Sequence, residues 1–103
     1  MESYDLAELA ISQHSHVWNL VFSRAKLMVV SDHGTRLWYI DIDGVTDDEL
    51  LKRFADSDSI EIAMTATTVG GRELSGSGFF HPNPRHRAAA IRGDGQLTGY
   101  GPQ

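Results

Sequence analysis

A single stretch with helical character divides a chain whose other apolar segments alternate in the manner of β-strands. Thr46 and Glu49 have the spacing of a capping box, and Val45 and Leu50 have that of a hydrophobic staple, so a helix is predicted to begin at Thr46. Residues 56–59 are polar and are expected to end it. The side chains predicted to be buried on this helix are Leu50, Leu51 and Phe54.

The acidic residues around this helix invite a calcium interpretation, which their spacing does not support. A calcium loop that begins at Asp41 needs a ligand at its fifth position, a glycine at its sixth and a glutamate at its twelfth. The chain has Val45, Thr46 and Lys52 at those positions. Helix capping and the helix dipole explain the same acids, so no metal site is expected here.

Before the helix, residues 17–22, 26–31 and 36–42 are predicted to form an antiparallel meander of three strands. The turn between the last two strands places Trp38 opposite Val29. The three strands then share one core face, which consists of Trp18, Leu20, Phe22, Leu27, Val29, Trp38, Ile40 and Ile42.

The opposite face of this meander is more apolar than a solvent-facing surface normally is. Its apolar members are Val21, Met28, Val30, Leu37 and Tyr39. The N-terminal segment, the second half of the chain or another subunit is expected to cover them. We therefore predict an interface on this face, most concretely that of a homodimer.

The first fifteen residues are interpreted as a lead-in to the meander. Leu6, Leu9 and Ala10 have helical spacing and Ser3 is a suitable N-cap, so a short N-terminal helix is one expectation for residues 3–13. Nine to eleven residues are few for a helix in isolation, and an extended lead-in is the alternative.

After the helix, residues 60–67 alternate clearly and a two-residue turn at Gly70 and Gly71 is predicted to start a hairpin. That register puts Gly76 and Gly78 on the outside, where they form a smooth patch with Ala63. Two more strands are expected, at residues 87–92 and 96–100, joined by a turn at residues 93–95 and followed by a tail at residues 101–103.

The predicted fold is therefore α+β, with the element order β-β-β-α-β-β-β-β. Two antiparallel meanders would form a curled sheet or half-barrel packed on one central helix. At 103 residues the chain has the size of one compact domain, spanning residues 1–103.

The composition excludes several classes of function. The absence of cysteine rules out disulfides, thiolate zinc sites and cysteine nucleophiles. The longest apolar run covers residues 27–30, too short to span a membrane, and the first residues are acidic where a signal peptide is basic. A cytoplasmic location is expected, and the net charge of −5 makes nucleic acid an unlikely partner.

The strongest candidate for ligand or partner binding is a basic segment at residues 81–92, which holds no acid. Its candidate residues are His81, Arg85, His86, Arg87 and Arg92. Arginine binds carboxylates and phosphates well, and Pro82 and Pro84 stiffen the loop. The alternative is a solvated loop whose positive charge contacts Asp47 or Asp48.

No group of residues has the spacing of a catalytic set. Ser77 lies between two glycines but lacks the strand–turn–helix context of a nucleophile elbow. His14 and His16 would make two metal ligands, and no third is evident from spacing. No catalytic residue, metal or cofactor is therefore predicted, although the sequence does not decide whether the protein is an enzyme.

The function favoured by the sequence is that of a non-catalytic protein-interaction or assembly module that associates with itself through the apolar sheet face. A binder of, or enzyme acting on, a small anion is the first alternative, with a half-barrel pocket near residues 81–87. Binding of single-stranded nucleic acid is the second alternative, and it would need exposed aromatics such as Phe79, Phe80 or Tyr100 beside the basic loop.

Overall fold

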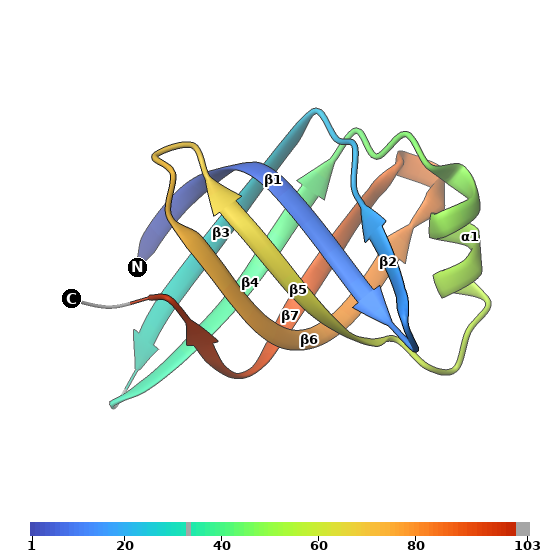
Figure 1. Cartoon of the computed structure of the whole chain (residues 1–103). Helices are drawn as coiled ribbons and strands as arrows, with labels where there is room; N and C mark the ends of the chain where they lie inside the picture. The colour runs from blue at the N-terminus through green and yellow to red at the C-terminus, as the bar shows by residue number, and fades with distance from the viewer. Residues whose placement is uncertain (33, 101–103) are drawn as a thin grey trace.

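The computed structural model describes residues 1–32 and 34–100 and shows a closed barrel of six antiparallel strands (Figure 1). In the order in which they pair, the barrel strands are β1 (Glu2–Gln13), β3 (Arg24–Asp32), β4 (Thr35–Asp43), β7 (Ala88–Thr98), β6 (Glu73–Asn83) and β5 (Glu61–Thr68). Pairing of β5 with β1 closes the barrel. The short strand β2 (His16–Asn19) extends the sheet beyond β1.

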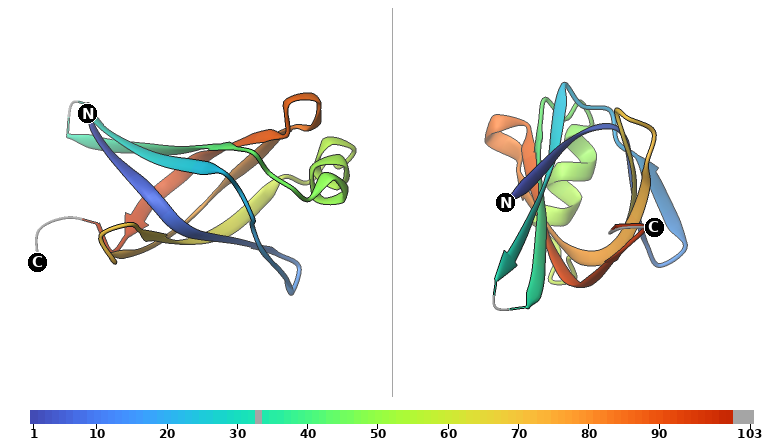
Figure 2. Two further views of the ribbon diagram at one scale, coloured as in Figure 1. Left: turned by 90° about the horizontal axis from the view of Figure 1, so that it is seen from above. Right: turned by 90° about the vertical axis from the view of Figure 1, so that its left-hand side faces the viewer.

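The predicted α+β fold with a central helix is therefore wrong. Strands hold 64% of the chain and helix only 11%, and the sheet closes on itself instead of curling over a helix. The helix α1 (Asp48–Ala55) lies at one end of the barrel, where it connects β4 to β5 (Figures 1 and 2). Because this connection crosses the barrel end, β7 lies between β4 and β6 in a Greek-key arrangement.

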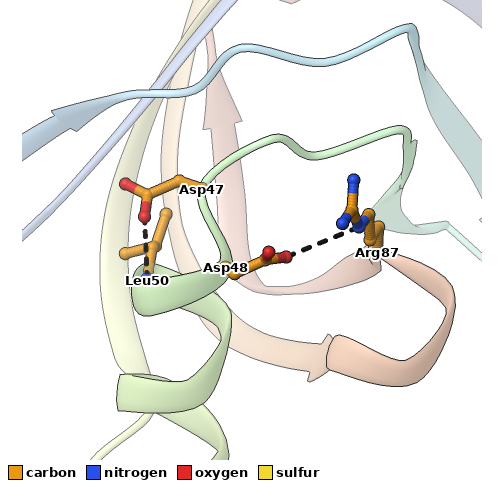
Figure 3. A network of polar contacts seen from close by, with 4 residues as sticks. All are labelled: Asp47, Asp48, Leu50 and Arg87. Carbon is orange, nitrogen blue, oxygen red and sulfur yellow. Dashed lines mark hydrogen bonds and ion pairs between the residues drawn. The ribbon is translucent and has the colours of Figure 1, made fainter.

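The helix closes its end of the barrel with the side chains that the sequence predicted. Leu50, Leu51 and Phe54 are buried, and the ring of Phe54 lies 4.9 Å from that of Phe80 on β6. Asp47 is the N-cap residue, one position after the predicted Thr46, and its Oδ1 accepts a hydrogen bond from the Leu50 amide at 3.0 Å (Figure 3). The helix ends at Asp56, as predicted.

The N-terminal segment is a strand, so the predicted short helix is wrong. The register of β1 against β5 shifts between Leu6 and Glu8, which marks a β-bulge. Because the bulge adds one residue, Leu6 and Leu9 are three positions apart and yet both buried. The prediction of a strand at residues 17–22 was also wrong in its pairing, because β2 pairs with β1 rather than with β3.

The hairpin of β3 and β4 has the predicted register. Val29 lies opposite Trp38 and Leu27 lies opposite Ile40, and all four side chains are buried. The turn between these strands was predicted around His33, which lies outside the described residues.

The hairpin of β5 and β6 has a loop of three residues instead of two. The Thr68 amide donates to the Arg72 carbonyl at 2.9 Å, and Gly71 has a φ of 95°. The extra residue moves the register by one position, so Gly76 lies opposite Met64 and Gly78 lies opposite Ile62, both buried. The glycines face the interior, and the predicted outer patch of glycines with Ala63 does not exist.

The last segment is one continuous strand, not the two that were predicted. Ser77 of β6 pairs with Asp94 of β7, and Ser75 pairs with Thr98. Between these two pairs β7 therefore has two more residues than β6. This irregularity bends β7 where a turn was expected, and Gly95 takes a φ of 83° there.

Candidate functional site

The outer surface of β3, β4, β7 and β6 brings together side chains from two distant parts of the chain. Tyr39 lies opposite both Met28 and Arg92, and Arg92 also lies opposite Phe79. We name the surface formed by this row and the neighbouring pair on β3 and β4 the outer face. It consists of Met28, Val30, Leu37, Tyr39, Phe79 and Arg92.

The outer face is open to solvent in the part of the chain that the structure describes. Leu37 is 56% exposed and Arg92 is exposed, while Met28, Val30, Tyr39 and Phe79 are half-buried. Four of the five residues predicted from the sequence as an interface thus lie on one surface. The N-terminal segment, which was one candidate to cover them, is built into the barrel wall instead.

Val21 is the predicted interface residue that the structure places elsewhere. It lies between β2 and β3 and its carbonyl accepts a hydrogen bond from the Thr46 amide at 3.2 Å. This contact is at the α1 end of the barrel, whereas Leu37 and Val30 lie toward the opposite end. The side chain of Val21 is 63% exposed but does not extend the outer face.

The charges around the outer face nearly balance. Lys26 lies opposite Asp41 in the row next to Tyr39, and Glu61 lies opposite Phe79. Lys26 also lies opposite Asp5 on β1, so with Arg92 these residues make two positive and three negative charges around an apolar centre. Because the whole chain carries −5, the outer face is less acidic than the protein as a whole.

The basic residues predicted as a binding site are divided between two places. His81 and Arg92 lie on the barrel wall, in the outward positions of β6 and β7. Arg85 and His86 belong to the short 3-10 helix η1 (Pro84–His86), and Arg87 follows it with a φ of 50°. The sequence therefore predicted one site, whereas the structure divides its residues. His81 and Arg92 lie on the barrel wall, and Arg85, His86 and Arg87 lie in the loop at the α1 end.

The loop of β6 and β7 contacts the start of the helix through Arg87. Its Nε lies 3.6 Å from Asp48 Oδ1, and the two side chains are 66% and 50% exposed (Figure 3). This contact matches the alternative interpretation, in which the basic loop offsets the acids at the helix start. At this exposure an ion pair contributes little to stability.

A hollow of about 310 Å³ lies at the α1 end, but it does not suit the predicted small anion. It is lined by Trp18, Asp47, Glu49, Leu50 and Arg53. The two carboxylates would repel an anion, and none of the five predicted basic residues lines this hollow. Arg53 lies over the Trp18 ring, with its guanidinium carbon 5.4 Å from the ring centre.

The aromatic platform needed for single-stranded nucleic acid does not assemble. Phe80 is buried in the core, and Tyr100 lies at the barrel end opposite α1. Phe79 is half-buried on the wall beside Arg92.

His14 and His16 are not joined by further metal ligands. His14 and Ser15 form the tight turn between β1 and β2, with φ values of 49° and 71°, and the His16 ring stacks on Trp18 at 5.7 Å. Over residues 1–32 and 34–100 no group of three or more histidine, aspartate or glutamate side chains could hold a metal ion.

A cluster that sequence reasoning missed lies at the barrel end opposite the helix. The Tyr4 hydroxyl donates to the Glu2 carboxylate at 3.0 Å, and the Tyr100 hydroxyl donates to its other oxygen. The Arg36 guanidinium lies 4.9 Å from the centre of the Tyr100 ring. These residues come from the two ends of the chain and from β4, so no local sequence pattern could have revealed them.

The hydrogen bonds in this cluster shift two pKa values. The Tyr100 hydroxyl, followed by that of Tyr4, lowers the pKa of the Glu2 carboxyl below its ordinary value of 4.5. The same bond to Glu2, with desolvation, raises the pKa of Tyr100 well above its ordinary value of 10.0. Both shifts favour the ionised carboxylate with neutral phenols around it.

No family model, curated protein or solved structure matches this chain. In the described part of the chain, no helix is long and apolar enough to cross a membrane. The geometry of the described residues is therefore the basis on which a function is assigned.

Proposed function

We propose that this chain is a non-catalytic protein-interaction module and that it associates with a second copy of itself through the outer face. The observation that carries the proposal is the row of Met28, Tyr39, Arg92 and Phe79 across four neighbouring strands. Methionine, tyrosine, phenylalanine and arginine are enriched at protein interfaces. None of these four side chains belongs to the buried core cluster or to the partly buried residues packed against it.

The charge distribution favours a second copy as the partner. Two copies with a net charge of −5 repel each other over most of their surfaces. On the outer face Lys26 and Arg92 offset most of the charge of Asp5, Asp41 and Glu61, so this repulsion is smaller there. In a twofold arrangement the acidic side chains of each copy can also form ion pairs with the basic side chains of the other copy.

The size of the outer face predicts weak association. Four strands at a spacing of about 4.8 Å make a row roughly 15 Å wide. A stable interface usually buries about 800 Å² on each partner, which is more than this row provides by itself. We therefore expect a concentration-dependent equilibrium between monomer and dimer.

Sedimentation velocity over a range of protein concentrations tests the proposal. The wild-type chain should change from monomer toward dimer as the concentration rises, and the variant Leu37→Ser should shift this transition to a higher concentration. Val69→Ser is the matched control, because Val69 is 71% exposed and lies in the β5–β6 loop away from the outer face.

A chain that stays monomeric at the highest accessible concentration would refute self-association. A dimer that Val69→Ser weakens as much as Leu37→Ser does would show that another surface is used. A second variant, Arg92→Glu, separates charge from apolar contact, because it should weaken the dimer most strongly at low salt.

A further inference from the structure

The barrel wall is open between β4 and β7 at the end opposite the helix. These strands pair from Asp43 opposite Ala88 to Tyr39 opposite Arg92, and both strands continue beyond the last pair. Past this point β7 bends away at Gly95, while the β3–β4 hairpin extends beyond the barrel (Figure 2). A hollow of about 520 Å³ lies between them, within the range of small-molecule sites.

The walls of this hollow combine apolar and aromatic side chains with an about equal share of polar surface. Its apolar lining residues are Leu37, Trp38, Leu97 and Tyr100, together with the backbone of Gly93 and Gly95. The indole Nε1 of Trp38 donates to the Gly95 carbonyl at 3.3 Å, which orients the ring and satisfies its polar atom. Trp38 is 4% exposed, so it forms the floor of the hollow, and Leu37, Leu97 and Tyr100 supply most of the apolar contact.

Two polar side chains supply the remaining chemistry. Arg36 lies two positions before Trp38 on β4, so both project to the same side of the strand at the mouth of the barrel. Its guanidinium is placed over the Tyr100 ring at 4.9 Å. Gln96 adds an amide to the rim, and among the residues that line the hollow Arg36 is the one with a charge.

Glu2 is close enough to Arg36 for the positive charge of Arg36, after the Tyr100 hydroxyl, to help lower the pKa of the Glu2 carboxyl. Its two oxygens accept hydrogen bonds from Tyr4 and Tyr100, and it does not line the hollow. Arg36 stacks on the ring of Tyr100, and a guanidinium held in this way keeps its edge for bidentate bonds to a carboxylate.

We infer that this hollow binds a small aromatic carboxylate, with the ring against Leu37, Leu97 and Tyr100 and the carboxylate on Arg36. Phenylacetate is a suitable probe, because it joins one ring to one carboxylate. Phenylacetamide has the same shape without the charge, and acetate has the charge without the ring. The site lies at the barrel mouth and shares Leu37 with the outer face, but binding there does not require self-association.

The test is titration of the isotope-labelled chain with each probe, followed by amide NMR, at a concentration where the chain is monomeric. Phenylacetate should shift the amides of residues 36–38 and 93–97 in a saturable way. Phenylacetamide should bind at least tenfold more weakly, and acetate should leave these amides unchanged. In a Trp18→Phe background, Trp38 fluorescence should report the same titration, since the chain has two tryptophans.

Arg36→Gln should lower the affinity for phenylacetate at least tenfold and leave that for phenylacetamide unchanged. Arg85→Gln is the matched control, because Arg85 is an exposed arginine at the other end of the barrel and should not alter binding. Equal binding of the two probes, equal effects of the two substitutions, or the absence of a saturable shift at these amides would overturn the inference.

Discussion

The indole ring of Trp38 lies directly against the backbone of Gly93, so a β-carbon at position 93 would overlap the ring. Gly76, on the neighbouring strand β6, borders the same ring, and a β-carbon there would stand 2.9 Å from Trp38 Cζ2. Trp38 is 4% exposed. The interior therefore holds a tryptophan at this point because two glycines on the facing strands make room for it.

We expect Gly93→Ala to lower the free energy of unfolding by about 1–3 kcal/mol, the usual range for an overpacked core. The added methyl group cannot be accommodated unless Trp38 moves, and its hydrogen bond to Gly95 opposes that movement. Urea denaturation of the variant and the wild type measures the difference.

Gly70→Ala is the control for this experiment. Gly70 lies in the β5–β6 loop, where the nearest atom to an added β-carbon is Thr68 Oγ1 at an ordinary 3.8 Å. Its unfolding free energy should stay within about 0.5 kcal/mol of wild type. Equal losses in the two variants would show that Trp38 does not depend on a glycine at position 93.

The helix cap offers a test that separates two adjacent residues. Asp47→Ala should lower the unfolding free energy by about 1 kcal/mol, because it removes the acceptor for the Leu50 amide. Thr46→Ala should have a much smaller effect, since the structure assigns the cap to Asp47. Thermal unfolding of both variants decides between them, and a larger loss for Thr46→Ala would restore the cap predicted from the sequence.

The contact of Arg87 with Asp48 should contribute little to stability. At 3.6 Å and with both side chains at least half exposed, their coupling energy should not exceed about 1 kcal/mol. A double-mutant cycle with Arg87→Gln and Asp48→Asn measures this coupling directly. A larger value that resists high salt would show that the loop is fixed to the helix by this pair.

Local patterns predicted the elements that local interactions determine. The register of β3 and β4 followed from apolar alternation and one short turn, and Val29 and Trp38 are paired as expected. The helix followed from its apolar stripe, with Leu50 and Phe54 buried, although its N-cap is Asp47 and not the predicted Thr46. In both cases the residues that decide the structure are close together in the sequence.

The errors arose where distant residues determine the structure. The spacing of Leu6 and Leu9 resembles that of a helix, but a bulge in β1, paired with β5, gives the same spacing in a strand. Gly93 and Gly95 resemble a turn, but they lie in β7 and accommodate Trp38, more than fifty residues earlier in the chain. Barrel closure was missed for the same reason, because it depends on pairing between β1 and β5.

The candidate sites show the same division. Met28, Val30, Leu37 and Tyr39 could be grouped from the sequence because they alternate along one hairpin. Their extension by Arg92 and Phe79 depends on the pairing of β4 with β7 and of β7 with β6. The hollow at the barrel mouth lies where pairing of β4 with β7 stops, which no local pattern indicates.

The cluster around Glu2 makes stability depend on pH in a defined direction. Hydrogen bonds from Tyr100 and Tyr4 lower the pKa of Glu2 in the folded chain below the ordinary 4.5. Its contribution to stability is therefore present above pH 4.5 and is lost as the pH falls through the lowered, folded-state pKa. Glu2→Gln should thus unfold at a lower temperature than wild type at neutral pH, and the difference should shrink and vanish in acid.

Thermal unfolding of wild type and Glu2→Gln between pH 7 and about pH 3 tests this dependence. Tyr100→Phe is the companion variant, because it removes the hydroxyl that contributes most to the shift and keeps the ring under Arg36. It should reduce the pH-dependent difference without abolishing it, since Tyr4 still donates to Glu2. If the melting temperatures of Glu2→Gln and wild type differ by the same amount at every pH, the Glu2 carboxylate and the two phenols do not interact in solution.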